Sequence, residues 1–178
     1  MSHRKIKSGK TIFSILEKDS KTTLRNLNKF YEVLVNLRFE GKQNVAKNMI
    51  RLRGLVSYFQ EEVKAHMREE EKVLFPFLRT HIPRLEPMIC LLVSEHGDFR
   101  NSLKDLNLSL SVFKKVNSDK TRIIHQFNEQ GIHLICLLRG HMSVETKTLY
   151  RAADNELRPD EKKRLIDQIK KNTSSRRK

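Results

Sequence analysis

The chain has 178 residues and a net charge of +15, from 36 lysines and arginines against 21 aspartates and glutamates. This length favours a single domain, and a hydrophobic fraction of 38% argues against a wholly disordered chain. Only two cysteines are present, which excludes a disulfide-rich scaffold. No apolar run is long enough to span a membrane, and residues 1–10 lack the apolar core of a signal peptide, so we expect a cytoplasmic protein.

The positive charge gathers at the two ends of the chain. Residues 1–10 carry four basic residues and no acid, and residues 158–178 carry nine basic residues and three acids. We therefore predict a basic N-terminal extension over residues 1–10, then a short helix at about 160–171 and a basic disordered tail within residues 159–178. No zinc-finger spacing or RNA-binding motif accompanies this charge, so we do not expect nucleic acid as a partner.

Four long stretches between these ends have the periodicity of amphipathic helices. In each stretch, residues of core type recur at steps of three and four, and no strand pattern competes. Segments that break helices separate the stretches at residues 39–44, 79–87 and 116–119. We predict an all-α fold: an antiparallel up-down-up-down four-helix bundle over residues 11–158, with a short extra C-terminal helix.

The predicted buried stripes contain a few polar residues among many apolar ones. They are Phe13, Leu16, Ser20, Leu24, Leu27, Tyr31 and Leu34; Leu52, Val56, Phe59, Val63, His66, Glu70, Val73 and Phe77; Ile89, Leu92, His96, Phe99, Leu103, Leu106, Leu110 and Phe113; and Ile124, Phe127, Gly131, Leu134, Leu138, His141, Glu145 and Leu149.

Five of these positions, His66, Glu70, His96, His141 and Glu145, are ionisable. A buried carboxylate without a partner is costly, by several kcal/mol in practice. A histidine and a glutamate four residues apart lie on one helix face, which is a geometry that chelates metal ions. Imidazole and carboxylate together suit iron, manganese or zinc. The alternative is a metal-free core in which the histidines and glutamates satisfy one another.

The spacing of these residues indicates an internal duplication. His66 and Glu70 lie 75 residues before His141 and Glu145. His96 lies 45 residues before His141, and the residue 46 positions before His66 is Ser20. We therefore predict two helical hairpins related by a pseudo-two-fold axis, with a serine in the first where the second has a histidine.

Together these motifs resemble those of the hemerythrin-like (HHE cation-binding) family over about residues 11–155. The residues that carry the resemblance are His66-Met-Arg-Glu-Glu70, Leu74-Phe75-Pro76, Glu95-His96 and His141-Met-Ser-Val-Glu145. The resemblance implies a four-helix bundle around a non-haem di-iron centre. It implies that Glu70 and Glu145 bridge two irons, that His96 and His141 bind one iron, and that His66 binds the other.

Two departures from the family pattern refine this expectation. Classical oxygen-carrying hemerythrins have a second histidine one turn from the third-helix ligand, where this chain has Leu92 and Arg100. The pattern is therefore closer to the branch that includes iron–sulfur cluster repair proteins. In the first half Ser20 stands at the place of a sixth ligand, unless Asp19 replaces it. We expect two irons per chain, or one if the His66 site is too weak, with manganese or zinc as alternatives.

The function that the resemblance implies is the binding or sensing of O2 or NO, or the handling of iron under oxidative or nitrosative stress. One alternative is iron–sulfur cluster repair, or reduction of peroxide or NO, at the same centre, so the sequence leaves open whether the protein is an enzyme. Another is a metal-free helical scaffold that binds nucleic acid through its basic tails. A signalling role would need a protein partner.

A few further residues carry expectations of their own. We expect Cys90 and Cys136 to be reduced and packed in the core. Glu71 is expected to face solvent, and Tyr31 and Tyr150 are candidates to line the cavity at the metal centre.

Overall fold

The computed structural model describes residues 12–39, 44–115 and 120–175, and the side chains of residues 20–39, 44–115 and 120–172. Its helices are α1 (Ile12–Phe39), α2 (Val45–Tyr58), α3 (Lys64–Glu69), α4 (Phe75–His81), α5 (Glu86–Lys115), α6 (Thr121–Val144), α7 (Tyr150–Glu156) and α8 (Pro159–Ser175). Three π-helical turns, η2 (Phe59–Val63), η3 (Glu70–Leu74) and η5 (Glu145–Leu149), and one 3₁₀ turn, η4 (Pro83–Leu85), lie between them. The described residues contain no strand, which confirms the predicted all-α class.

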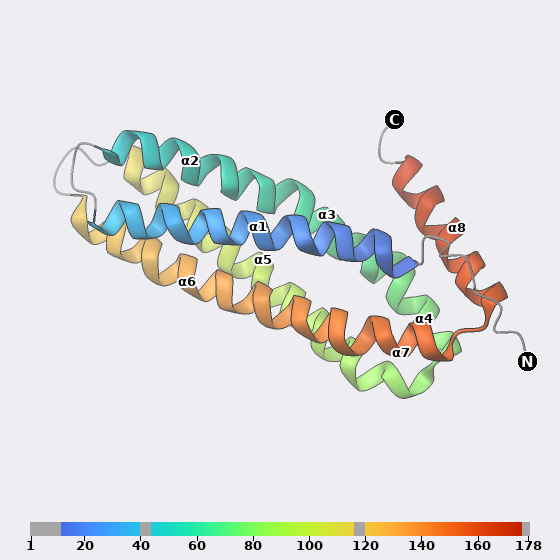
Figure 1. Cartoon of the computed structure of the whole chain (residues 1–178). Coiled ribbons are helices and arrows are strands. Elements are labelled where there is room, and N and C mark those ends of the chain that lie inside the picture. The colour runs from blue at the N-terminus through green and yellow to red at the C-terminus, as the bar shows by residue number, and fades with distance from the viewer. Residues whose placement is uncertain (1–11, 40–43, 116–119, 176–178) are drawn as a thin grey trace, which may run out of the picture.

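The long helices form a helical bundle, in which short helices and π-turns continue one another as rods (Figure 1). One rod is α1, the second runs from α2 through η2, α3 and η3 to α4, the third is α5, and the fourth runs from α6 through η5 to α7. Helix α1 packs against α2 and α6, and α5 packs against α6 and α2. No helix among the described residues is long and apolar enough to cross a membrane.

Two apolar clusters fill the interior at different levels along the rods. The first includes Phe30 and Phe59, whose rings meet edge to face with centroids 5.3 Å apart. The second includes Leu74, Leu92 and Leu149 and lies where α4, α5, α7 and α8 meet. The predicted ionisable residues fall between these clusters along the second, third and fourth rods, so apolar packing closes both ends of the polar layer.

Helix α8, at the place of the predicted C-terminal helix, packs on the bundle. Its start is capped by the Glu161 carboxylate, which accepts a 2.8 Å hydrogen bond from the backbone N–H of Arg158. Leu165 and Ile169 are buried in the second apolar cluster. The helix continues to Ser175, past the predicted end near residue 171 and into the segment expected to be disordered. No glycine or proline follows Pro159, so nothing in the sequence stops the helix earlier. Residues 1–10 and 176–178 lie outside the described residues.

The predicted stripes are correct in the third rod and partly wrong in the first. Every stripe residue of α5 is buried. In α1, however, Leu24 and Tyr31 are 39% and 48% exposed, while Phe30 is fully buried. The buried stripe there runs through Leu27, Phe30 and Leu34, and successive helical residues are rotated by about 100°, so Tyr31 turns away from the core.

The prediction that both cysteines pack in the core is also wrong. Cys90 and Cys136 are free and exposed. Each directly follows a buried residue, Ile89 or Ile135, and the same rotation of about 100° carries it to the edge of the packed face.

The internal duplication is visible in the burial pattern. Ten buried residues of the second rod and its end have a buried counterpart 75 positions later. The ten are Leu52, Val56, Phe59, Val63, Met67, Glu70, Leu74, Phe75, Leu78 and Ile82, and their counterparts are, in the same order, Phe127, Gly131, Leu134, Leu138, Met142, Glu145, Leu149, Tyr150, Ala153 and Leu157. Six buried residues of α1 have a buried counterpart 76 positions later in α5. The six are Ser20, Leu27, Phe30, Val33, Leu34 and Leu37, and their counterparts are, in the same order, His96, Leu103, Leu106, Ser109, Leu110 and Phe113. Ser20 is therefore the structural counterpart of His96.

Candidate metal centre

Both predicted glutamate ligands stand at the start of a π-turn. Helix α3 ends at Glu69 and η3 begins at Glu70, while α6 ends at Val144 and η5 begins at Glu145. Such turns are rare and occur frequently at functional sites. The turn at Glu70 also advances the buried stripe by one residue, so that Leu74 is 1% exposed while the predicted Val73 is only half-buried.

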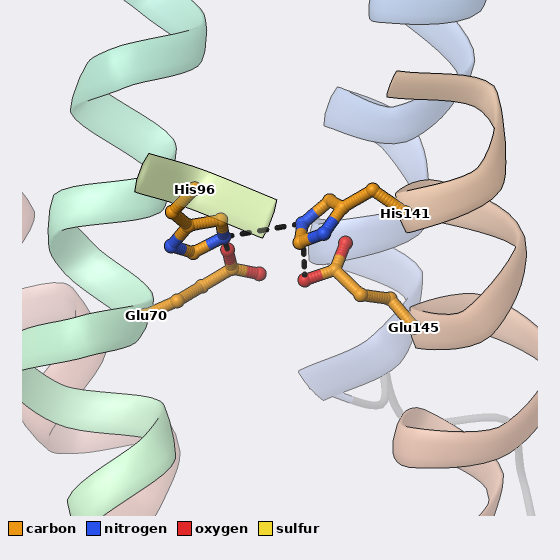
Figure 2. Close-up of side chains that lie close together, drawn as sticks. All are labelled: Glu70, His96, His141 and Glu145. Atoms are coloured by element: carbon orange, nitrogen blue, oxygen red, sulfur yellow. Dashed lines mark hydrogen bonds and ion pairs between the residues drawn. The ribbon is translucent and has the colours of Figure 1, made fainter. Parts of the chain in front are cut away.

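Four of the five predicted ligands gather in one buried group. Potential ligand atoms of Glu70, His96, His141 and Glu145 lie within 4.8 Å of one another. Figure 2 shows the side chains pointing toward a common centre from the second, third and fourth rods. The Nε2 atoms of His96 and His141 are 3.1 Å apart. His96 Nε2 lies 3.5 Å from Glu70 Oε2, and His141 Nε2 lies 3.3 Å from Glu145 Oε1.

The fifth predicted ligand, His66, lies beside this group rather than within it. Its Nε2 atom is 3.1 Å from Glu70 Oε1, the oxygen that faces away from His96, and its side chain is 21% exposed. Ser20 is buried and lines a small cavity together with His66 and the buried pair His141 and Glu145. The cavity offers about 20 Å³ to the centre of a water-sized molecule, which is room for one such molecule. The side chain of Asp19 lies outside the described residues.

Two carboxylate oxygens at the centre have no hydrogen-bond partner. Glu70 Oε2 and Glu145 Oε1 are both buried and make no hydrogen bond of good geometry, although a histidine Nε2 atom lies 3.5 Å from the first and 3.3 Å from the second. The other oxygen of Glu70, Oε1, accepts a 2.9 Å hydrogen bond from the Tyr150 hydroxyl. Leaving a buried charged acceptor without a partner costs more than the roughly 1–3 kcal/mol of a neutral one. A cation between the two carboxylates would satisfy both orphaned oxygens, so the residues present fit a metal ion.

The two central histidines are held from behind by carboxylates. His96 Nδ1 lies 2.8 Å from Glu71 Oε1, which also accepts a 2.8 Å hydrogen bond from Arg100. His141 Nδ1 lies 2.9 Å from Glu95 Oε2. Each ring can donate its Nδ1–H to the carboxylate behind it, which leaves Nε2 facing the centre. A metal ion can bind that Nε2 atom once it has displaced any proton there.

Sequence reasoning missed these outer partners. The prediction that Glu71 faces solvent is wrong, because its carboxylate reaches across to His96 on α5. Which acid beside a ligand turns inward depends on the neighbouring rod, and one sequence does not reveal that. Arg100 hydrogen-bonds Glu71 and does not belong to the central group. Of the two tyrosine candidates, Tyr150 is buried at the site and Tyr31 is not.

Burial and mutual repulsion separate the ionisation of the two central glutamates. Burial raises the pKa of Glu145, and the negative charge of Glu70 raises it further, against the effect of His141. Burial also opposes ionisation of Glu70, but His66, together with Glu145 and His96, outweighs it and lowers the pKa of that carboxyl. The metal-free pair therefore releases its protons in two separate steps.

The two central histidines are also shifted in opposite directions. Burial lowers the pKa of His96, although Glu70 acts against it. Burial acts the same way on His141, but the carboxylates of Glu145, Glu70 and Glu95 outweigh it and raise the pKa of His141 to about 9. In the metal-free protein, His141 therefore carries a proton at neutral pH, and a metal ion must displace it.

Two imidazoles and two carboxylates form a donor set that suits iron, manganese or zinc. A comparison with protein families is consistent with this chemistry: the family described as hemerythrin HHE cation binding domain matches residues 11–153. No curated protein sequence matches the chain. The matched region contains all five predicted ligands and the cavity at Ser20. The chain therefore belongs to the hemerythrin HHE cation-binding domain family.

Proposed function

We propose that this protein is an up-down-up-down antiparallel bundle that holds a non-haem di-iron centre and binds a small diatomic ligand, O2 or NO, beside it. The observation that carries this proposal is the buried group of Glu70, His96, His141 and Glu145 with its two orphaned carboxylate oxygens. Bound iron would supply reversible ligation and a change of oxidation state.

The residues divide the work unequally in this proposal. His96 and His141 would hold the first iron, because both lie in the central group with their Nδ1 atoms fixed by carboxylates. Glu70 and Glu145 would connect the two ions, since they approach the centre from different rods. His66 would hold the second iron together with Glu70, whose Oε1 atom lies 3.1 Å from His66 Nε2.

The cavity at Ser20 is where the diatomic ligand would lie. It adjoins His66 and Glu145, and its remaining lining includes the apolar side chains of Val63, Met67 and Leu138. An apolar cavity with room for one water-sized molecule favours a small neutral molecule over an ion, because an ion would lose its hydration there.

We further propose that the protein resembles the iron–sulfur cluster repair branch more than the oxygen carriers. Neither Leu92 nor Arg100, the two positions one turn from His96, is a histidine, and Arg100 binds Glu71 instead. We also propose that it works in the cytoplasm, where exposed thiols such as those of Cys90 and Cys136 stay reduced.

Elemental analysis of untagged protein, purified without chelator, tests the metal proposal together with a visible spectrum of the same sample. We expect close to two irons per chain and near-ultraviolet charge-transfer bands. His141→Ala should reduce the iron content. His133→Ala is the matched control, since both histidines are on α6 but His133 is exposed. A protein that still contains no iron after anaerobic iron loading would contradict the proposal.

Ligand binding is tested on the iron-loaded, reduced protein by adding NO or O2 and recording difference spectra. Saturation at one ligand per centre, without consumption of an added reductant, is the expected result. Steady consumption of reductant would show that the protein is an enzyme that reduces the gas.

A further inference from the structure

A groove of about 660 Å³ lies between α8 and the segment formed by η3 and α4. It lies apart from the metal centre, and none of the predicted ligands lines it. Part of its lining is apolar and comes from Val73, Pro76 and Phe77. Phe77 is buried, and its ring stacks on His81 at a centroid distance of 4.0 Å, so the apolar part of the groove is fixed in place.

Basic residues border this apolar lining on both sides. Lys72 belongs to η3, and Arg164 and Lys171 belong to α8, so positive charge faces the groove from two elements. No lining residue is acidic. Arg164 forms an exposed ion pair with Asp160, whose carboxylate lies 3.5 Å from it. An exposed pair of this kind contributes little to stability, so an acidic ligand can replace it.

We propose that this groove binds an acidic segment of a partner protein, with an apolar side chain against Val73 and Pro76 and carboxylates beside the basic residues. The positive charge of the groove favours an anionic partner. Its apolar lining favours a partner with an apolar side chain, which a protein segment can supply and the phosphate backbone of a nucleic acid cannot. Nucleic acid fits less well, because Phe77 is buried against His81 and offers no open ring face for a base.

The place of the groove gives the bound segment a connection to the proposed centre. Lys72 and Val73 belong to the same π-turn that begins at Glu70. On the other side of the groove, Asn172 of α8 donates a 3.4 Å hydrogen bond to Glu69, the residue before that turn. A partner seated here contacts the outside of the turn whose buried residue Glu70 belongs to the metal centre. Binding itself needs no metal, so the groove and the proposed function can fail independently.

The test uses the full chain and a fluorescein-labelled peptide in which single leucines are set among glutamates, with binding followed by fluorescence anisotropy. We expect saturable binding at one site per chain, and weaker binding when the leucines are replaced by serine. The main variant is Arg164→Glu with Lys171→Glu. Its control is Lys114→Glu with Lys115→Glu, which changes the net charge equally at the end of α5, and Figure 1 shows that end of α5 on the far side of the bundle from α8.

The groove variant should weaken binding at least about tenfold, and the control should change it little. Because a charge change on α8 could loosen that helix, Thr80→Glu on α4 places an acid in the groove without altering α8 and should weaken binding as well. Circular dichroism confirms that each variant is folded. Equal losses in the groove and control variants, absence of binding, or a single-stranded oligonucleotide that outcompetes the peptide at the groove would each overturn the proposal.

Discussion

At equivalent positions of the two hairpins, residues 12–81 and 86–156, Ser20 corresponds to His96 and Phe75 corresponds to Tyr150. The burial pattern is shared, but these two positions differ in chemistry. In the second hairpin His96 joins the central group, and the Tyr150 hydroxyl donates to Glu70 in the first. In the first hairpin Phe75 has no hydroxyl to offer, and it packs its ring on His96 at a centroid distance of 5.7 Å.

This comparison shows that packing and ligation impose separate constraints on the duplicated halves. The apolar positions can exchange one buried residue for another of different size, as at Leu78 and Ala153, while the pattern persists. A ligand position cannot do this, because a serine hydroxyl does not replace an imidazole. We therefore expect the first half to keep its shape and to bind metal more weakly than the second. The following predictions test this asymmetry.

The largest effect should come from removing the histidine of the complete half. We expect His141→Ala to lower metal affinity at least about 100-fold, because it removes a member of the central group and leaves Glu145 without its histidine partner. His66→Ala should cost less, because His66 lies outside that group. Metal content after purification and competition with a chelator measure both variants. Equal losses in the two would show that the halves are equivalent.

Metal affinity should rise with pH across the neutral range. In the metal-free protein the pKa of His141 is raised to about 9, and the pKa of Glu145 is raised as well, so both hold protons that a metal must displace. Each displaced proton makes the affinity about tenfold higher per pH unit until the group is deprotonated. Calorimetric titration in buffers of different ionisation enthalpy counts these protons. Glu145→Gln should reduce the count, and a count of zero near pH 7 would refute the assignment.

Tyr150→Phe should make the second half resemble the first. The variant removes the hydroxyl that donates to Glu70 Oε1, and loss of such an outer partner lowers metal affinity about tenfold. Tyr58→Phe is the matched control, since it removes a tyrosine hydroxyl that hydrogen-bonds Thr23 and none of the predicted ligands. Both variants are measured for metal affinity by chelator competition. If Tyr58→Phe reduces affinity as much as Tyr150→Phe, the effect is a general loss of packing.

Gly131→Ala tests the packing side of the comparison. Gly131 is the counterpart of Val56, yet a Cβ atom there would lie 2.4 Å from Leu34 Cδ1 and 3.2 Å from Phe30 Cε1. Both neighbours are fully buried, so we expect a loss of about 1–3 kcal/mol in the free energy of unfolding. Gly54→Ala is the control in the other hairpin, because nothing lies within 4 Å of its Cβ position. It should stabilise by about 0.5–1 kcal/mol, and urea denaturation of the metal-free protein measures both.

Part of the fold and part of the candidate site could be predicted from the sequence. Periodicity and the spacing of the two His–Glu pairs were enough to predict the helices, the duplication and the residues of the central group. The π-turns at Glu70 and Glu145 were not predicted, because a helical period averaged over a stretch hides one extra residue. The outer partners Glu71 and Glu95 depend on contacts between rods, which no local pattern encodes.

Ser20→His should have the smallest effect and is the sharpest test of the duplication. An imidazole at this position would stand where His96 stands in the second half, beside His66. The gain in affinity should appear only at the weaker of two sites and stay below about tenfold, because a cavity of about 20 Å³ cannot hold an imidazole without movement of its lining. Ser20→Leu is the control, since it adds similar bulk without a ligand atom. Stepwise iron titration followed by the visible spectrum resolves the two sites. Strengthening of the tighter site, or equal effects of the two variants, would show that the first half did not lose its metal ligand at Ser20.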